Sequence, residues 1–150
     1  MRDLHAVTPA EEEALKLSHQ LCFPLYAAAR RVVGLYTPYL APLGLTYTQY
    51  IVLLALWEED GLTVGELGSR LFLDSGTLTP VFKKLEGSGY LLRERDSRDE
   101  RSVRVRLTPQ GASFRSQVKD IPAQVGSCLP LSPTEAGQLY LLLYQVLRQA

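Results

Sequence analysis

The chain has 150 residues, 46% of them hydrophobic, and its 16 basic and 16 acidic side chains give a formal net charge of zero. This length is enough to bury one hydrophobic core, and no Pro-, Gly- or Ser-rich linker divides it, which predicts a single domain over residues 1–150. A zero net charge excludes a chain that is basic throughout, so attraction to nucleic acid would need a local excess of basic residues.

Such an excess lies in the middle of the chain. Residues 83–106 hold eight Lys or Arg against five acidic residues, whereas residues 1–20 hold two basic residues against four acidic ones. The first residues lack the apolar segment of a signal peptide, and no apolar run reaches transmembrane length. We therefore expect a soluble cytoplasmic protein with no membrane partner.

The cysteines and histidines show no metal-type spacing. Cys22 and Cys128 are far apart in the sequence, and in a reducing compartment they are expected to be free or redox-active thiols. His5 and His19 are expected at the surface. No metal or other cofactor is predicted.

Residues 11–40 are predicted to form a long helix with a broad apolar face, interrupted by Pro24. Either this helix kinks, or a new helix begins with Pro24 in its first turn. The second geometry would place Cys22 just before a helix N-terminus, a position that favours the thiolate. An inert thiol inside a hydrophobic core is the alternative for Cys22.

The segments at 45–50 and 62–67 share a capping-box pattern, in which a Thr begins a helix and Gln or Glu follows three residues later. They predict one helix as far as Gly61 and a second, shorter helix that ends near Leu71. A third helix over 74–85 follows after two residues, which is the spacing of a helix-turn-helix.

The third helix has two contrasting faces. Its apolar residues recur at i, i+3, i+4 and i+7, as in a helix that packs on a core by one face: Leu78, Val81, Phe82 and Leu85. Short hydroxyls, a glycine and two lysines on the opposite face can approach phosphates and base edges in a major groove. An ordinary capped surface helix has a similar start. The predicted DNA-contacting residues are Asp74, Ser75, Gly76, Thr77, Thr79, Pro80, Lys83 and Lys84.

Two short strands at 92–95 and 103–107 predict a hairpin, because apolar and basic residues alternate in the second. A helix-turn-helix followed by such a hairpin is a winged helix. The charged connection between the strands supplies the predicted DNA contacts of the wing, Arg98, Asp99 and Arg101, with Arg101 at a phosphate or in the minor groove. A plain solvated loop is the alternative.

The C-terminal part is expected to be helical. Thr108 and Pro109 begin a helix that Pro122 bends, and a capping box at 132–135 starts a last helix. This last helix has more apolar surface than a small winged helix needs, which suggests a dimer. Two recognition helices of a dimer can enter successive major grooves of a palindromic site.

The predicted fold is therefore mainly α with a small β-hairpin wing. A winged helix-turn-helix core at 45–108 is flanked by helices at 11–40 and 109–150, which we expect to serve in sensing and dimerisation.

The segment LDSGTLTPVFKKLEGSGYLLRERDSRDERSVRVRLTPQG resembles the winged-helix core of the MarR family of bacterial repressors. LCFPLYAAARRVVGLYTPYLAPLGLTYTQYIVLLALWE is similar to the sensor half of the organic hydroperoxide resistance regulators (OhrR), and the resemblance runs from about Leu21 to Pro122. It implies a dimeric repressor, not an enzyme, that binds double-stranded operator DNA when reduced. Oxidation of its reactive cysteine by an organic hydroperoxide would release the DNA.

The resemblance also implies roles for individual residues. Cys22 would be the peroxide-reactive cysteine, Tyr36 and Tyr47 would donate hydrogen bonds to its thiolate, and Tyr26 would line the same site. Cys128 lies near the position of a resolving thiol from the other subunit. Pro24 departs from the family pattern.

Two alternatives remain at this point. A thiol peroxidase could use both cysteines for turnover, and a MarR-like repressor could be released by a non-covalent phenolic ligand, with Cys22 as pocket lining.

Overall fold

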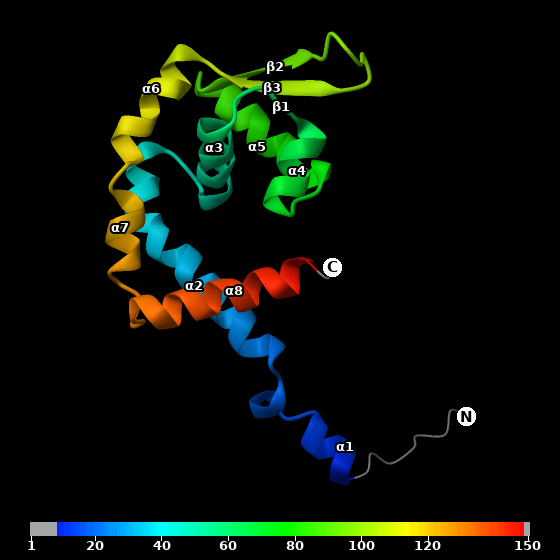
Figure 1. The fold of residues 1–150 in the computed structure, drawn as a ribbon, viewed down its shortest axis with the longest axis vertical. Coiled ribbons are helices and arrows are strands. Elements are labelled where there is room, and N and C mark those ends of the chain that lie inside the picture. Colours follow the sequence, from blue (N-terminus) through cyan, green and yellow to red (C-terminus); the bar gives the residue numbers. More distant parts are fainter. Residues whose placement is uncertain (1–8, 149–150) are drawn as a thin grey trace, which may run out of the picture. The chain divides into compact units, whose positions relative to one another are not determined.

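The computed structural model describes residues 9–148 (Figure 1). These residues fall into two compact units, which divide between Tyr47 and Thr48. The single domain expected over the whole chain stays a prediction. Within the described range, no single helix is long and apolar enough to cross a membrane.

The first unit consists of helical segments separated by short breaks. They are α1 (Pro9–Ala14), the 3-10 turn η1 (Leu17–His19), α2 (Cys22–Leu40) and the 3-10 turn η2 (Ala41–Leu43). The prediction of one long helix over 11–40 is wrong, because the backbone is extended at Lys16 and Gln20.

The second of the two geometries considered for Pro24 is the one observed. Pro24 lies in the first turn of α2, where its missing N–H would have had no partner within the helix. Cys22 is the first residue of α2.

The second unit contains most of α3 and all later elements. In chain order they are α3 (Tyr47–Glu58), β1 (Leu62–Thr63), α4 (Val64–Leu71), α5 (Ser75–Gly87), β2 (Leu91–Arg95), β3 (Val103–Leu107), α6 (Pro109–Val118), α7 (Ile121–Gly126) and α8 (Pro133–Arg148). The order α4, α5, β2, β3 is that of a winged helix-turn-helix, so the predicted fold class is confirmed. α3 ends at Glu58, earlier than the predicted Gly61.

The capping box predicted at the start of α4 is observed. The Thr63 N–H donates to the Glu66 carboxylate over 2.7 Å, and the Glu66 N–H donates back to the Thr63 hydroxyl over 3.2 Å, which completes a capping box. α4 ends at Leu71, and Phe72 turns the chain with a positive φ of 54°. Asp74 then caps α5.

The sheet has three antiparallel strands in the order β1-β3-β2. The predicted hairpin is confirmed, with β2 starting one residue earlier than expected. β1 was not predicted, since it has two residues and pairs Leu62 with Val105 of β3. The sheet and helices α3 to α7 enclose a core formed by Tyr50, Val52, Leu53, Leu56, Leu62, Leu67, Leu78, Phe82, Leu85, Leu91, Val105, Phe114, Val118, Ile121 and Val125.

The predicted helix from Thr108 is two helices. α6 ends at Val118, and α7 begins at Ile121 with Pro122 in its first turn, so the chain breaks before the proline instead of bending at it. The capping box before α8 is confirmed, because the Ser132 N–H and the Glu135 N–H each donate to the other residue's side chain.

Candidate DNA interface and thiol sensor

The two faces predicted for α5 are observed. Leu78, Phe82 and Leu85 are buried, and Val81 is half-buried. The residues predicted to contact DNA are all exposed: Asp74, Ser75, Gly76, Thr77, Thr79, Pro80, Lys83 and Lys84. α5 therefore presents a surface of hydroxyls and ammonium groups that the protein core leaves uncovered.

Asp74 is engaged within α5 itself. Its carboxylate accepts the Thr77 N–H over 2.8 Å and the Thr77 hydroxyl over 2.9 Å. These bonds hold the pKa of Asp74 below its ordinary value, so the residue carries a negative charge at neutral pH. Asp74 thus fixes the start of the helix, and a phosphate would approach the neighbouring hydroxyls more readily than this carboxylate.

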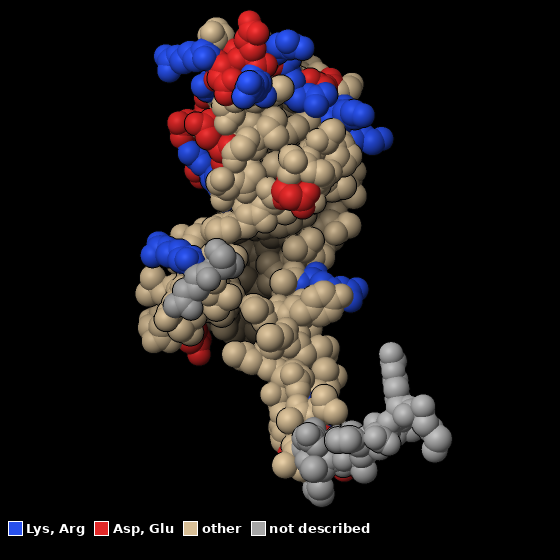
Figure 2. All heavy atoms as spheres, turned by 90° about the vertical axis from the view of Figure 1, so that its right-hand side faces the viewer, with Lys and Arg blue, Asp and Glu red and all other residues tan. Residues whose placement is uncertain are grey.

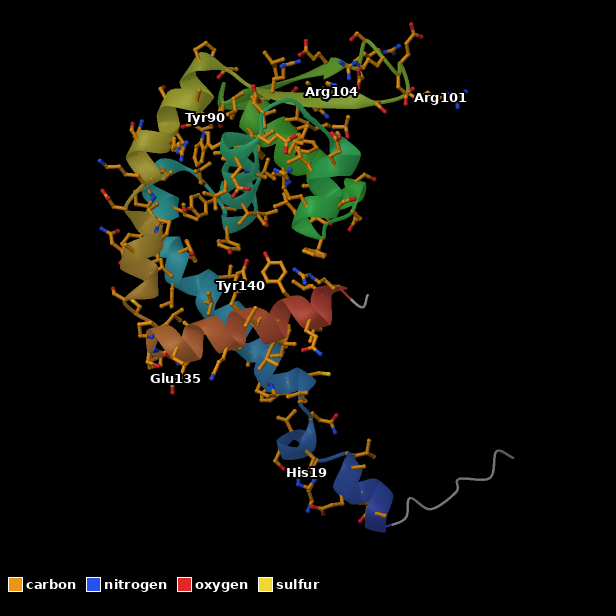
Figure 3. The ribbon with its side chains drawn as sticks, viewed as in Figure 1. His19, Tyr90, Arg101, Arg104, Glu135 and Tyr140 are labelled. Atoms are coloured by element: carbon orange, nitrogen blue, oxygen red, sulfur yellow. The ribbon has the colours of Figure 1, made fainter. Side chains whose placement is uncertain are left out.

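Asp99 organises the tip of the wing. Its carboxylate accepts the Arg101 N–H and the Ser102 hydroxyl, each over 3.0 Å, and its carbonyl accepts the Ser102 N–H over 2.8 Å. Arg101 is exposed and lies at the far end of the hairpin (Figure 3). The turn built by Asp99 therefore presents the Arg101 side chain to solvent.

Some basic residues of segment 83–106 form ion pairs with acidic side chains, and others do not. Ion pairs neutralise three arginines: Arg93 with Glu86 over 2.7 Å, Arg104 with Asp96 over 2.7 Å, and Arg106 with Glu94. Within the described part of the chain, the remaining basic residues of this segment form no ion pair: Lys83, Lys84, Arg95, Arg98 and Arg101. Lys and Arg gather at the end of the second unit that carries the hairpin (Figure 2).

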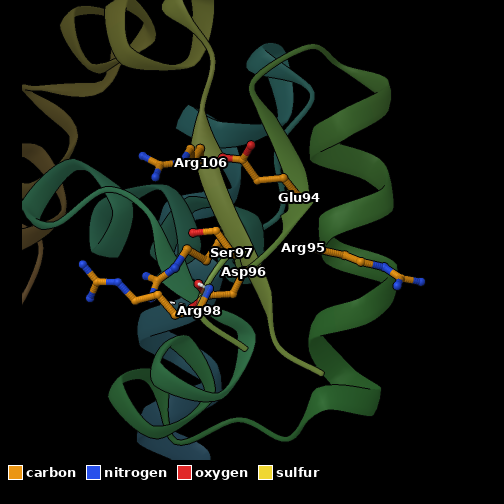
Figure 4. Close-up of a pocket in the computed structure, with 7 residues that line it drawn as sticks. Glu94, Arg95, Asp96, Ser97, Arg98 and Arg106 are labelled. Carbon is orange, nitrogen blue, oxygen red and sulfur yellow. Dashed lines mark hydrogen bonds and ion pairs between the residues drawn. The ribbon is translucent and has the colours of Figure 1, made fainter. Parts of the chain in front are cut away.

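Arg95 was not predicted as a DNA contact. It is exposed and points away from Asp96, Arg98 and Arg106 (Figure 4). Arg93, two positions earlier in β2, pairs with Glu86 of α5, and alternate residues of a strand share a face. Arg95 therefore lies on the side of the sheet that faces α5 (Figure 4). The alternation along the strand is visible in the sequence, but the contact of Arg93 with α5 is not.

Tyr36 and Tyr47 lie together in the first unit, with their ring centroids 4.8 Å apart. Burial raises the pKa of both phenols above the ordinary value, and for Tyr47 the neighbouring Tyr36 adds to the effect. Both phenols are therefore protonated at neutral pH and able to donate hydrogen bonds.

Cys22 is exposed, and the structure does not bring it to these tyrosines within one chain. Tyr36 follows Cys22 by fourteen residues in the same helix, which corresponds to roughly 21 Å along the axis. Tyr26, one turn after Cys22, is 59% exposed, and its hydroxyl accepts a 3.4 Å hydrogen bond from Arg30.

Cys128 is also exposed and follows the end of α7, where its thiol donates to the Gln124 carbonyl over 3.4 Å. His19 is exposed, as predicted, and contacts Glu13; His5 lies outside the described residues. Over residues 9–148, no group of three or more His, Cys, Asp or Glu could hold a metal ion.

The chain is similar to proteins of a known family. The family described as "Transcriptional regulator SarA/Rot" matches residues 34–120. The organic hydroperoxide resistance transcriptional regulator of Bacillus subtilis (strain 168) is 44% identical over 133 residues, which are 89% of this chain and 90% of the relative.

Two solved forms of AbfR, a protein of Staphylococcus epidermidis, have the same fold. Reduced AbfR bound to DNA matches with a TM-score of 0.76 and 37% identity, over 95% of this chain and 99% of that one. Disulfide-formed AbfR matches with a TM-score of 0.65 and 38% identity, over 93% and 96%. The chain thus belongs to the MarR family of winged-helix regulators, of the SarA/Rot type, and is a transcriptional regulator and not an enzyme.

Proposed function

We propose that the chain is a redox-sensing repressor. As a homodimer it binds palindromic operator DNA while Cys22 is reduced, and it leaves the DNA when an organic hydroperoxide oxidises Cys22. The observation that carries the proposal is the exposed Cys22 thiol at the first residue of α2. Its relatives support it, since one is named for organic hydroperoxide resistance and another has been solved in a DNA-bound and a disulfide form.

The proposed chemistry begins with the Cys22 thiolate. It attacks the outer oxygen of the hydroperoxide, the O–O bond breaks, and the organic group leaves as an alcohol while the sulfur becomes a sulfenic acid.

The proposed roles of Tyr36 and Tyr47 require a second copy of the chain. About 21 Å of helix separates Cys22 from Tyr36, so the two phenols of one protomer would donate to the Cys22 thiolate of its partner. Phenols stabilise that anion without bringing a cation into an apolar site, which suits an organic hydroperoxide. Tyr26 would line the same site beside Cys22.

Unpartnered apolar surface supports dimerisation. α8 has no buried residue, although it contains the exposed side chains Leu139, Tyr140, Leu141, Leu142, Val146 and Leu147. In the first unit the large exposed apolar residues include Leu15, Leu17, Leu21, Phe23 and Leu25. Apolar surface of this extent marks an interaction site, and a second copy would cover it.

Operator DNA would meet the exposed face of α5 and the wing. The hydroxyls of α5 lie where base edges would be read, and the unpaired residues Lys83, Lys84, Arg95, Arg98 and Arg101 would neutralise phosphates. Bacterial DNA is in the cytoplasm, which is the proposed location of the protein.

The experiment that tests the proposal compares wild type with Cys22→Ser. Binding to a labelled duplex from the region upstream of the protein's own gene is measured by fluorescence anisotropy, before and after treatment with cumene hydroperoxide. We expect both reduced proteins to bind alike and only wild type to dissociate. Dissociation of the oxidant-treated Cys22→Ser protein would remove Cys22 from the mechanism.

A further inference from the structure

The base of the wing contains a buried negative charge. Asp96, which directly follows β2, is 5% exposed, and within the described residues it is the only charged side chain so deeply buried. Burying a carboxylate is costly unless it is paired and hydrogen-bonded. The contacts of Asp96 therefore identify the groups that stabilise its buried carboxylate.

Both oxygens of the Asp96 carboxylate are used. Oδ1 accepts the Arg98 N–H over 2.9 Å, and Oδ2 contacts the Arg104 guanidinium over 2.7 Å. The Asp96 N–H also donates to the Ser102 carbonyl over 2.9 Å. Asp96 thus closes the loop that carries the wing tip and ties it to β3. The Arg98 N–H and the Arg104 guanidinium hold the pKa of Asp96 below its ordinary value, so the carboxylate stays ionised at neutral pH.

Arg104 extends this contact to the helix-turn-helix. Its second terminal nitrogen donates to the Gly61 carbonyl over 2.6 Å. Gly61 directly precedes β1, and Thr63 at the end of β1 pairs with Arg104 and caps α4. One guanidinium therefore connects the wing loop, the central strand and the start of α4.

The neighbouring ion pair on the same sheet face is different. Arg106 and Glu94 pair with side chains that are 50% and 48% exposed. Exposed pairs contribute little to stability, and this one does not reach the helix-turn-helix. It provides a matched control for the buried pair.

We propose that Asp96 is a positioning residue for DNA binding: through Arg104 and Gly61 it fixes the wing against the helix-turn-helix so that Arg98 and Arg101 reach the DNA backbone. This inference rests on the proposed DNA-binding function. Asp96 thus contributes to DNA affinity, although DNA would repel its negative charge.

The test uses Asp96→Asn, which keeps the shape of the side chain but removes its charge, with Glu94→Gln as the control. Binding to the upstream duplex is measured between 50 and 200 mM salt. We expect Asp96→Asn to bind about tenfold more weakly or worse, with a salt slope reduced by about 0.9 for each phosphate that the wing no longer neutralises. Glu94→Gln releases Arg106 from its ion pair and should bind at least as tightly as wild type, with no reduction of the salt slope.

A combined variant separates positioning from general destabilisation. If Asp96 acts through the wing tip, adding Asp96→Asn to an Arg98→Ala/Arg101→Ala protein should lower DNA affinity little further. The two arginine side chains that Asp96 positions are already absent from that protein. Equal losses in both backgrounds, or wild-type affinity and salt slope in Asp96→Asn, would overturn the proposal.

If Asp96→Asn does not fold, Arg104→Lys tests the same positioning of the wing. The substitution keeps a positive charge beside Asp96 but replaces the planar guanidinium by a single ammonium group. The ammonium cannot contact the Asp96 carboxylate and the Gly61 carbonyl with the same geometry. A reduced salt slope is expected, and an unchanged slope would contradict the inference. Failure of the DNA-binding function itself is distinguishable, because wild type would then not bind the duplex.

Discussion

Ion pairing decides which basic side chains are available to DNA. The sequence shows eight Lys or Arg over residues 83–106, but three arginines are neutralised by acidic neighbours. The free ones lie on α5, at the end of β2 and in the wing loop. A count of charges therefore overstates the basic surface, and the position of each partner is needed to locate it.

This sorting predicts how the salt dependence of DNA binding responds to substitution. Arg95→Ala and Arg101→Ala should each reduce the slope of log K against log salt by about 0.9 for every phosphate left without its arginine, hence about twice that in a dimer. The slope is measured by anisotropy at several salt concentrations.

Arg115→Ala is the control, because Arg115 is exposed on α6, outside the helix-turn-helix and wing. An unchanged slope in Arg95→Ala would remove that residue from the interface, and the same result for Arg101→Ala would leave the wing tip without a role in affinity.

A close backbone contact joins α6 to the start of the wing. The Thr108 N–H donates to the Tyr90 carbonyl over 3.1 Å, and a Cβ at Gly111 would lie 1.8 Å from that carbonyl oxygen. The Gly111 carbonyl in turn accepts the Trp57 indole N–H over 2.9 Å. Glycine is needed at position 111 because two backbone segments meet there.

We predict that Gly111→Ala destabilises the fold. The added methyl group must push α6 away from Tyr90, and overpacking of this kind costs roughly 1–3 kcal/mol or more. Gly65→Ala is the matched control, since its Cβ would meet no atom within 4 Å, and the change should stay within about 0.5 kcal/mol. Urea unfolding followed by circular dichroism measures both. Equal stability of the two variants would contradict the packing described for Gly111.

Local sequence patterns predicted the elements that depend on neighbouring residues. The boxes at Thr63 and Ser132 and the apolar stripe of α5 are all set by contacts within a few positions. β1 was missed because two residues become a strand only by pairing with β3, which is distant in the sequence. The breaks around η1 were missed because the apolar pattern continues through them.

The site was predictable in part for the same reason. The exposed face of α5 and the presentation of Arg101 follow from local patterns. The pairing of Arg104 with Asp96 and Gly61, by contrast, depends on how the hairpin meets the turn before β1. The resemblance to peroxide sensors suggested Cys22, Tyr36 and Tyr47, and the geometry of α2 adds that the three cannot meet within one chain.

The proposed mechanism couples the thiol chemistry to the dimer. A sulfenic acid on Cys22 is reversible while a thiol can condense with it, and further oxidation to the sulfinic acid is not readily reversed. Cys128 of the partner is the proposed resolving thiol, and its condensation with the sulfenic acid would form a disulfide and release water. The Cα atoms of a disulfide lie within about 7 Å, so the bond would constrain the relative positions of the protomers.

We predict a dimer band on non-reducing gels after hydroperoxide treatment, because the disulfide would link two chains. The band should be absent in both Cys22→Ser and Cys128→Ser, and mass spectrometry should show more sulfinic acid on Cys22 in the Cys128→Ser protein. A monomeric oxidised wild type that carries a small-thiol adduct on Cys22 would show that Cys128 takes no part.

The control of DNA binding by Cys22 is tested by titrating the DNA-bound, reduced protein with cumene hydroperoxide and following the anisotropy of the labelled upstream duplex. We predict that about one equivalent of hydroperoxide per Cys22 releases the DNA and that dithiothreitol restores binding. Continued binding after Cys22 has been fully oxidised, as verified by mass spectrometry, would contradict the claim that oxidation of this residue controls DNA binding.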